Sequence, residues 1–541
     1  MLRIAVLKQL LLKLEHYFPN LPDLSIALFG GILMGLTPAP IQAWVFAWIA
    51  LVPLYFILFK DEKISLQQAS LLGLIWGCGY HGLALFWITG IHPMTWLGVP
   101  WLPSLLIALF CWLFITIWGA SLVAVWSGLL CLINQKIVTK DHLNPLIIAS
   151  FRVLTATAIW GALEAFWSSG VLWWTSLSYT QSYHNLVILQ LSKFSGPATV
   201  TAIIVAVNSL VAESLLVKKN PIKKYPYLTT NSLLLTALLF LFAFHLIGWQ
   251  IYKSPLVEIP ENAIKVGIIQ GNVPNEIKFN DTGFRQAIEG YTKGYQKLVR
   301  AGADAVLLPE TALPFIWDET RPNRSSFYSA ILTENIPAWV GSFGTKGKSL
   351  TNSLFSVNGD GKVISRYDKS KLVPLGEYIP LESILGRLIE RLSPLDAHLA
   401  LGENNQAFET PFGKAIVGIC YESAFAEIFR RQAQRGGQFI LSAANNAHYS
   451  QSMPKQHHAQ DVMRAIETER WAVRATNTGY SAFVDPQGRT MWMSEINQYN
   501  LNSQTIYRRN TQTLYVRWGD WLTWVLLSLS VLGYVLIRFL S

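Results

Sequence analysis

Long apolar runs fill the first half of the chain and return at its end, whereas the part between them has a mixed composition. Residues from about Leu24 to Ile251 and from Trp518 to Leu540 include long stretches without charge. About 20 consecutive apolar residues suffice to span a bilayer as a helix. The pattern therefore predicts eight transmembrane helices, at residues 24–38, 41–59, 67–90, 102–133, 146–166, 187–217, 231–251 and 519–539.

The basic residues of the short loops lie on alternate sides of these predicted helices. They occur in the N-terminal segment and in the loops after the second, fourth and sixth helices, whereas loops 37–41, 91–101 and 167–186 hold none. By the positive-inside rule, both termini are cytoplasmic and residues 252–518 lie outside the cytoplasm. Lys8 and Lys13 interrupt the first apolar run, which favours an amphipathic surface helix over a cleaved signal peptide.

The net charge of +10 does not by itself indicate a nucleic-acid partner. The basic residues lie in short loops between apolar runs and form no single aromatic-rich patch. Of the 541 residues, 51% are hydrophobic and only 14% are charged, whereas about one quarter of an ordinary soluble chain is charged. The composition therefore favours an integral membrane protein, with lysines that orient it, over a nucleic-acid-binding protein.

The region from Ile264 to Arg509 has the alternation of strands and helices that is typical of a soluble α/β domain. We expect the chain to divide into a membrane region at 1–251, an extracytoplasmic domain at 252–518 and a last span at 519–541. The predicted strands are Ile264–Gln270, Ala305–Leu308, Ala338–Ser342, Ser353–Val357, Lys362–Tyr367, Ala415–Ile419 and Phe439–Ala443. The predicted helices are Gly283–Ala301, Glu422–Arg435 and His458–Thr476.

Cys420 is the only cysteine of this domain, because Cys78, Cys111 and Cys131 lie in apolar runs. It therefore has no disulfide partner within its own domain. Outside the cytoplasm the surroundings are usually oxidising, and an unpaired thiol there is a candidate reactive group. A buried packing cysteine explains the same observation equally well.

Three residues with reactive side chains follow predicted strands. Glu310 follows the strand at 305–308, Lys369 follows the strand at 362–367, and Cys420 follows the strand at 415–419. Sites in α/β sheets form at the carboxyl ends of strands. If these strands are parallel neighbours, the three side chains converge.

A carboxylate, an ammonium group and a thiol are together sufficient for acyl transfer. The carboxylate takes the thiol proton as the sulfur attacks a carbonyl, and the ammonium group stabilises the negative oxygen of the tetrahedral intermediate. Each residue also has an ordinary structural explanation. Glu310 could cap a helix, Lys369 could be a solvated surface charge, and Cys420 could be a packing residue. Only their joint placement favours catalysis.

The same segments resemble the nitrilase, or carbon–nitrogen hydrolase, superfamily, whose sites use Glu, Lys and Cys. With a domain between the seventh and eighth spans, the whole chain resembles the apolipoprotein N-acyltransferase family of the bacterial inner membrane. The resemblance rests on Gln270-Gly271-Asn272, Leu308-Pro309-Glu310-Thr311, Tyr367-Asp368-Lys369, Leu372-Val373-Pro374-Leu375-Gly376-Glu377-Tyr378, Cys420-Tyr421-Glu422 and Arg474-Ala475-Thr476-Asn477-Thr478-Gly479.

The resemblance implies a nitrilase-like αββα sandwich and roles for individual residues. Glu310 is the implied general base, Lys369 the oxyanion stabiliser and Cys420 the nucleophile, with supporting residues at Glu377, Tyr421 and Glu422. The family usually has Trp where this chain has Phe279, and Asn-Asp-Ala-Trp where it has Asn445-Asn446-Ala447-His448. Both departures are expected in the wall of the substrate pocket, so Phe279 is a candidate substrate-binding residue.

The resemblance also implies the substrates. A phospholipid ester is the expected acyl donor, and the acceptor is the α-amino group of an S-diacylglyceryl-cysteine at the N-terminus of a lipoprotein. Two half-reactions through a thioester on Cys420 imply ping-pong kinetics. We expect the protein to lie in the bacterial inner membrane, with a periplasmic catalytic domain, no cofactor and a monomeric state.

An amphipathic stretch after Glu377 is a second candidate for substrate contact. Its apolar residues fall at helical spacing, so Leu385 and Leu388 could contact lipid at the interface, or the same face could pack on the domain's own core. We predict no metal, because neighbouring His457 and His458 point to different faces of a helix. The apolar face comprises Leu381, Ile384, Leu385, Leu388, Ile389 and Leu392.

Two other functions use the same features. A membrane-tethered amidase or nitrilase would share Glu310, Lys369 and Cys420 but would use water as the second substrate. A non-catalytic membrane scaffold that binds lipoproteins would need none of the three, so their joint presence disfavours it.

Overall fold

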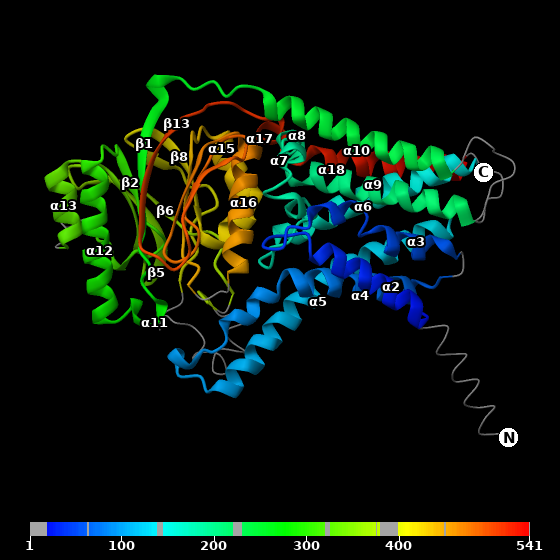
Figure 1. Cartoon of the computed structure of the whole chain (residues 1–541), viewed down its shortest axis with the longest axis horizontal. Coiled ribbons are helices and arrows are strands. Elements are labelled where there is room, and N and C mark those ends of the chain that lie inside the picture. Colours follow the sequence, from blue (N-terminus) through cyan, green and yellow to red (C-terminus); the bar gives the residue numbers. More distant parts are fainter. Residues whose placement is uncertain are drawn as a thin grey trace. The chain divides into compact units, whose positions relative to one another are not determined.

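A computed structural model describes residues 19–61, 64–137, 144–219, 230–319, 325–374, 376–378, 399–447 and 451–539 (Figure 1). The chain divides into two compact units. The first comprises Met1–Phe86, Leu109–Tyr252 and Asp520–Ser541, and the second comprises Trp87–Ala108 and Lys253–Gly519.

The first unit is helical. Its short helices are α7 (Leu186–Leu189) and α8 (Ser192–Ser195), with 3₁₀ turns η1 (Trp44–Trp48) and η4 (Leu177–Gln181). Its longer helices are α2 (Leu21–Gly35), α3 (Val52–Lys60), α4 (Leu66–Ala84), α5 (Trp101–Gln135, which begins in the second unit), α6 (Pro145–Ser169), α9 (Pro197–Lys219), α10 (Thr230–Lys253) and α18 (Trp521–Phe539).

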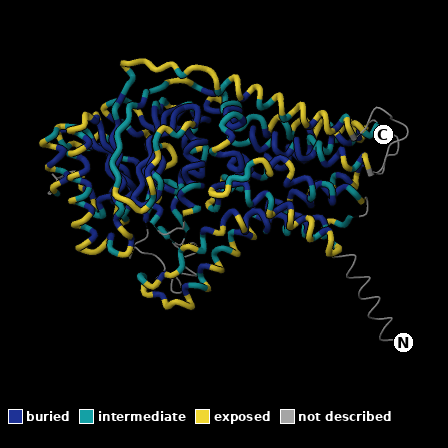
Figure 2. Tube along the Cα trace, viewed as in Figure 1, coloured by how far each residue is buried: buried dark blue, intermediate teal, exposed yellow. Residues whose placement is uncertain are grey.

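Among the described residues, five helices are long and apolar enough to cross a membrane: α5, α6, α9, α10 and α18. Their outward surfaces are apolar, as on α10, where Leu235, Leu238 and Phe242 are exposed (Figure 2). Apolar side chains on an outer face suit a lipid surrounding. These helices confirm an apolar helical region of a membrane protein.

The other three expected spans are not clearly spans by length and composition. Helix α2 has 15 residues, the segment at 41–59 divides into η1 and the nine-residue α3, and α4 is not among the five apolar helices. Glycines bring α2 and α4 into close contact, because a Cβ at Gly31 would lie 2.0 Å from the carbonyl oxygen of Trp76. Small residues commonly allow such packing between membrane helices.

The sixth predicted span, 187–217, is wrong in its first third. Gly196 has a φ of 66° and ends α8, and a continuous helix begins only at Pro197. A glycine in the left-handed region ends a helix without steric cost, and proline at the first helical position needs no N–H partner.

The second unit contains two β-sheets. Within the described residues, the seven-stranded sheet has the order β13-β1-β2-β4-β5-β6 with β3 beside β4, and the six-stranded sheet has the order β12-β11-β10-β9-β8-β7. The first sheet comprises β1 (Ala263–Gln270), β2 (Ala305–Leu307), β3 (Leu313–Ile316), β4 (Ala338–Lys346), β5 (Ser349–Val357), β6 (Val363–Asp368) and β13 (Asn500–Tyr507). The second comprises β7 (Phe408–Thr410), β8 (Gly413–Ile419), β9 (Ile440–Ala444), β10 (Ala472–Thr476), β11 (Ala482–Val484) and β12 (Thr490–Met493).

The two sheets pack face to face, and helices cover their outer faces. One buried core joins Val266 and Trp339 of the first sheet to Val417 and Leu441 of the second. The helices of the unit are η2 (Phe86–Ile91), η3 (Thr95–Leu97), η5 (Pro260–Asn262), α11 (Asn275–Lys278), α12 (Asp281–Arg300), α13 (Ser326–Glu334), η7 (Cys420–Ala424), α15 (Ala426–Gln434), α16 (Ser452–Thr468) and α17 (Leu514–Trp518). Helices α12 and α13 share a core with the first sheet, whereas α15 and α16 pack on the second. The expected αββα sandwich is therefore confirmed.

Helix α12 illustrates why the outer layer forms. The Asn280 side chain caps its first turn by accepting hydrogen bonds from the N–H groups of Thr282 and Gly283. Asparagine is among the preferred N-cap residues. Ala287, Tyr291 and Leu298 recur at helical spacing and are buried against the sheet.

The segment at 87–108, which includes the first residues of α5, follows α4 in sequence, yet it belongs to the second unit. The indole N–H of Trp87 donates to Oε1 of Gln456 on α16 at 3.0 Å. This hydrogen bond is one of the contacts that tie the segment to the sandwich.

The predicted helix at 458–476 is wrong in its second half. Helix α16 ends at Thr468, Glu469 has a φ of 56°, and Ala472–Thr476 forms strand β10. This strand pairs in parallel with β9, so tertiary pairing overrides the apparent helical continuity. The predicted helix at 422–435 is also divided, because η7 ends at Ala424 before α15 begins.

Candidate active site

Cys420 lies at the turn that follows β8. Its φ is 52°, so this non-glycine residue adopts the left-handed region, which is a strained conformation common at functional sites. Its carbonyl oxygen lies 2.7 Å from Nε2 of His457, and its thiol donates to the carbonyl oxygen of Asn445 at 3.7 Å. Cys420 is buried and forms no disulfide. One contact thus holds the backbone of Cys420, and the other orients its thiol.

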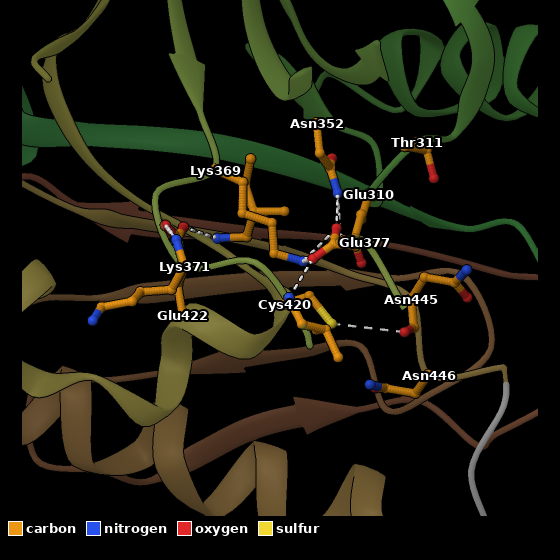
Figure 3. A network of polar contacts seen from close by, with 12 residues as sticks. Glu310, Thr311, Asn352, Lys369, Lys371, Glu377, Cys420, Glu422, Asn445 and Asn446 are labelled. Atoms are coloured by element: carbon orange, nitrogen blue, oxygen red, sulfur yellow. Dashed lines mark hydrogen bonds and ion pairs between the residues drawn. The ribbon is translucent and has the colours of Figure 1, made fainter. Parts of the chain in front are cut away.

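Lys369 joins two carboxylates beside this turn (Figure 3). Its Nζ lies 2.9 Å from Oε1 of Glu310 and 3.0 Å from Oε1 of Glu377. Asn352, on β5, donates from Nδ2 to the same two oxygens at 2.7 and 2.9 Å. The backbone N–H of Val373 donates to Oε2 of Glu377 at 2.8 Å. The result is a buried network of two acids held by one ammonium group and one amide.

The convergence expected from the sequence requires that the three central residues follow neighbouring parallel strands. In the structure they do not. Strands β2 and β6, which precede Glu310 and Lys369, lie in one sheet with β4 and β5 between them. Strand β8, which precedes Cys420, belongs to the other sheet. That premise is therefore wrong. The side chains share one polar site because the two sheets pack face to face.

The electrostatics of the site keep Glu310 negatively charged, Lys369 positively charged and the Cys420 thiol protonated. Burial raises the pKa of Glu310, but the Lys369 ammonium outweighs burial and holds this pKa below its usual range. Burial lowers the pKa of Lys369, but Glu310 and Glu377 together hold it well above its usual range. Burial, with the negative charge of Glu310, raises the pKa of Cys420 to about 12. Because only the thiolate is a strong nucleophile, a thiol in this state would need a base to take its proton before it could attack a carbonyl.

Glu422 is fully buried and supports the loop that carries Lys369. Its Oε1 accepts hydrogen bonds from the N–H and hydroxyl of Ser370, both at 2.7 Å, and its Oε2 accepts from the N–H of Ile419 at 2.8 Å. It thus links the residue after Lys369 to the residue before Cys420. Tyr421 is half-buried, and its ring packs edge-on against Phe425 at 5.1 Å.

The candidate substrate-binding residues have less structural definition. The Phe279 side chain is 46% exposed, with its ring centroid 6.3 Å from that of Phe343, so it can contact a ligand that approaches from outside. Leu385, Leu388 and the rest of the predicted amphipathic helix lie outside the described residues, as does His448.

In the part of the chain that the structure describes, no group of three or more His, Cys, Asp and Glu residues could hold a metal ion. His457 and His458 face different partners, the Cys420 carbonyl and the Thr490 hydroxyl. Burial lowers the pKa of His457 to about 3, so its ring is neutral. His457 thus has a backbone partner, the carbonyl group of Cys420, and within the described residues it shows no feature of a metal ligand.

Sequence reasoning missed Asn352 and Lys278. Asn352 is buried in β5, between Thr351 and Ser353, and a run of polar residues in a buried strand was the available signal. Lys278 is buried at the end of α11, where its Nζ donates to Oγ1 of Thr311 at 2.6 Å. A lone lysine in a short polar segment gave no signal of burial.

We expect Asn352→Leu to slow catalysis by about 10- to 150-fold. The variant removes the amide that donates to both carboxylates, and a hydrogen bond to a charged group contributes about 1.5–3 kcal/mol. The measurement is the rate of acyl transfer by purified protein, compared with Asn405→Leu, which changes an exposed asparagine. A normal rate in a correctly folded Asn352→Leu protein would show that the amide does not support the carboxylates.

The comparisons with known proteins match both halves of the chain. Residues 265–511 match the family model Carbon-nitrogen hydrolase, and residues 30–210 match the model Apolipoprotein N-acyltransferase N-terminal domain. An apolipoprotein N-acyltransferase of Nostoc sp. is 55% identical over 505 residues, which cover 93% of this chain and 97% of that protein. A protein of the same name from Synechocystis sp. is 49% identical, with coverage of 93% and 98%. Among solved structures, an amidase from Nesterenkonia sp. is 17% identical, with a TM-score of 0.36 and coverage of 49% and 96%.

Proposed function

Because the chain belongs to the apolipoprotein N-acyltransferase family, we propose that it transfers an acyl chain to lipoproteins in two steps, through a thioester on Cys420. The observation that carries this proposal is the buried Glu310–Lys369–Glu377 network that interacts electrostatically with the Cys420 thiol. An acid that stays ionised beside a protonated thiol has the protonation state that a general base requires.

In the first step, Glu310 takes the proton of the Cys420 thiol as the sulfur attacks the ester carbonyl of a phospholipid. Lys369 stabilises the negative oxygen of the tetrahedral intermediate. The ester C–O bond then breaks, and the leaving oxygen takes the proton from Glu310. A lysophospholipid departs, and the acyl group remains on sulfur.

In the second step, the α-amino group of a lipoprotein's S-diacylglyceryl-cysteine attacks the thioester carbonyl. Glu310 accepts a proton from this amine, Lys369 again stabilises the oxyanion, and the C–S bond breaks. The Cys420 sulfur regains a proton from Glu310, and the product is an amide-linked acyl chain. Glu377 and Glu422 position Lys369, Tyr421 supports the turn after Cys420, and Phe279 contacts the substrate.

The same proposal includes the finer topology. The chain crosses the inner membrane eight times, with α2, the η1–α3 segment and α4 as short or partly buried spans beside the five longer helices. The basic loops place both termini in the cytoplasm and residues 252–518 in the periplasm. Domain limits at 1–251, 252–518 and 519–541 follow from that order, and the protein acts as a monomer without a cofactor.

Intact-protein mass spectrometry after incubation with phospholipid tests this function. We expect a mass increase of one acyl group that maps to Cys420 and disappears when a diacylglyceryl-cysteine peptide is added. A protein that releases free fatty acid or ammonia, never acylates the peptide and carries no adduct would instead be a hydrolase.

A further inference from the structure

Lys278 brings a second ammonium group to the active site. Its side chain is 2% exposed, and its Nζ donates to Oγ1 of Thr311 at 2.6 Å and to the carbonyl oxygen of Glu310 at 3.3 Å. A buried ammonium group loses its hydration, so it is retained only where other charges compensate it. The charge that compensates it is that of Glu310, and the same ammonium group would also interact favourably with a negative charge on the Cys420 sulfur.

The charges of the site explain why a second cation is needed. Lys369 carries one positive charge, but it contacts two carboxylates, Glu310 and Glu377. Among the described residues, the groups that hydrogen-bond the Glu377 carboxylate are donors, namely Lys369, Asn352 and the N–H of Val373, as suits an ionised carboxylate. The side chains of Glu310, Lys369 and Glu377 therefore carry a net charge of −1, which Lys278 offsets. The carboxyl of Glu422, which is also buried nearby, interacts with Lys369 and with the Lys371 ammonium.

Proton transfer within the site does not change this sum. When Glu310 takes the thiol proton, the negative charge moves to sulfur, and it then moves to the carbonyl oxygen of the acyl group. Without Lys278, this charge would develop in a buried site that already has an excess of negative charge, which low dielectric penalises.

We propose that Lys278 is a positioning residue whose positive charge offsets the second carboxylate and thereby favours ionisation of the Cys420 sulfur. The inference rests on the proposed role of Cys420 as nucleophile. It differs from a purely structural role, in which Lys278 would only donate hydrogen bonds to Thr311, a residue that has a φ of 42°. Burial lowers the pKa of Lys278 to about 8, so its charge is present at neutral pH and is lost as the pH rises above this value.

The test separates the charge of Lys278 from its hydrogen bonds. Lys278→Gln keeps an amide donor without the charge, and Lys278→Arg keeps the charge. The double variant Lys278→Gln/Glu377→Gln loses one charge of each sign and restores the native sum. The measurement is the second-order rate of alkylation of Cys420 by iodoacetamide in the full-length protein, in detergent without lipid, between pH 6 and 9. Lys265→Met, which changes a lysine that bonds the Ala301 carbonyl away from the site, is the control.

We expect Lys278→Gln to slow alkylation at pH 7 by about tenfold or more, because an opposite charge within a few ångströms shifts a pKa by about 1–3 units. Lys278→Arg should stay within about threefold of the native rate, and the double variant should recover most of the loss. A native rate in Lys278→Gln, or no recovery in the double variant, would overturn the proposal. If Lys278→Gln does not fold, the alkylation rate of the single variant Glu377→Gln decides. This variant removes one negative charge, so it should accelerate alkylation.

This experiment can fail independently of the proposed function. Alkylation uses no lipid, whereas the acyl adduct on Cys420 requires a phospholipid donor. If the acyl adduct forms but the alkylation rate does not depend on the charge at position 278, the proposed acyltransferase function is retained and the role of Lys278 is rejected. Alkylation that depends on the charge of Lys278, without an acyl adduct, would retain the charge effect and reject the thioester on Cys420.

Discussion

Cys420→Ser is expected to abolish acyl transfer, with a loss on the order of 10⁴-fold or more. Serine keeps the shape of the side chain at a position where the backbone is already in the left-handed region. Its hydroxyl is far harder to ionise than a thiol, so Glu310 can no longer generate the nucleophile. The acyl adduct expected in mass spectrometry of the native protein should be absent, together with the transfer activity.

The matched control is Cys131→Ser. Cys131 is buried in α5, and its thiol donates only to the Ile64 carbonyl at 3.4 Å. The same chemical change should leave the activity near normal there, since that thiol faces no acid or ammonium group of the site. A Cys420→Ser protein with near-normal transfer would exclude a thioester on this residue, whereas equal losses in both variants would indicate damage to the fold.

The candidate residues of the site could be singled out in the sequence because their types are rare in their context. Cys420 is the one cysteine of a domain with no disulfide partner, and Glu310, Lys369 and Cys420 each directly follow a strand or the residues that extend it. Strand ends are easy to locate from short β-branched runs. The structure places all three in one site.

The way in which these residues meet could not be predicted from the sequence. It depends on two sheets packing face to face, and no local pattern tells which strand joins which sheet. The strand Ala472–Thr476 was hidden for the same reason, since its pairing with β9 gives it a strand conformation after a long helix. Long-range pairing decides both features.

The supporting polar residues were hidden because their burial is a tertiary property. Asn352 and Lys278 have ordinary local sequences, and only the folded chain shows that each contacts the Glu310 region. The membrane segments show the same limit. Hydrophobicity located the apolar runs, but helix packing through Gly31 and the break at Gly196 determine which runs are long helices.

Glu310→Gln is the second variant for which we expect a very large effect, about 10²- to 10⁴-fold on formation of the acyl adduct. Glutamine has nearly the same shape, and Lys369 keeps its contact with Glu377. What the variant removes is the group that takes the thiol proton. Single-turnover formation of the adduct is the measurement, and Glu409→Gln, which changes a half-buried residue of β7 that pairs with Lys414, is the control.

The dependence of this rate on pH distinguishes a lost base from a damaged site. In the native protein, Lys369 holds the pKa of Glu310 below its usual range, so Glu310 is ionised across neutral pH and loses its function as a base as the pH falls through that lowered value. The native rate should therefore be nearly flat in pH between about 6 and 8, since the usual glutamate pKa is about 4.3. In Glu310→Gln, solvent must remove the proton of a thiol whose pKa burial still holds above its usual range, so the rate should rise about tenfold per pH unit across this range. A variant rate that is low but flat in pH would mean that Glu310 holds the site together without acting as its base.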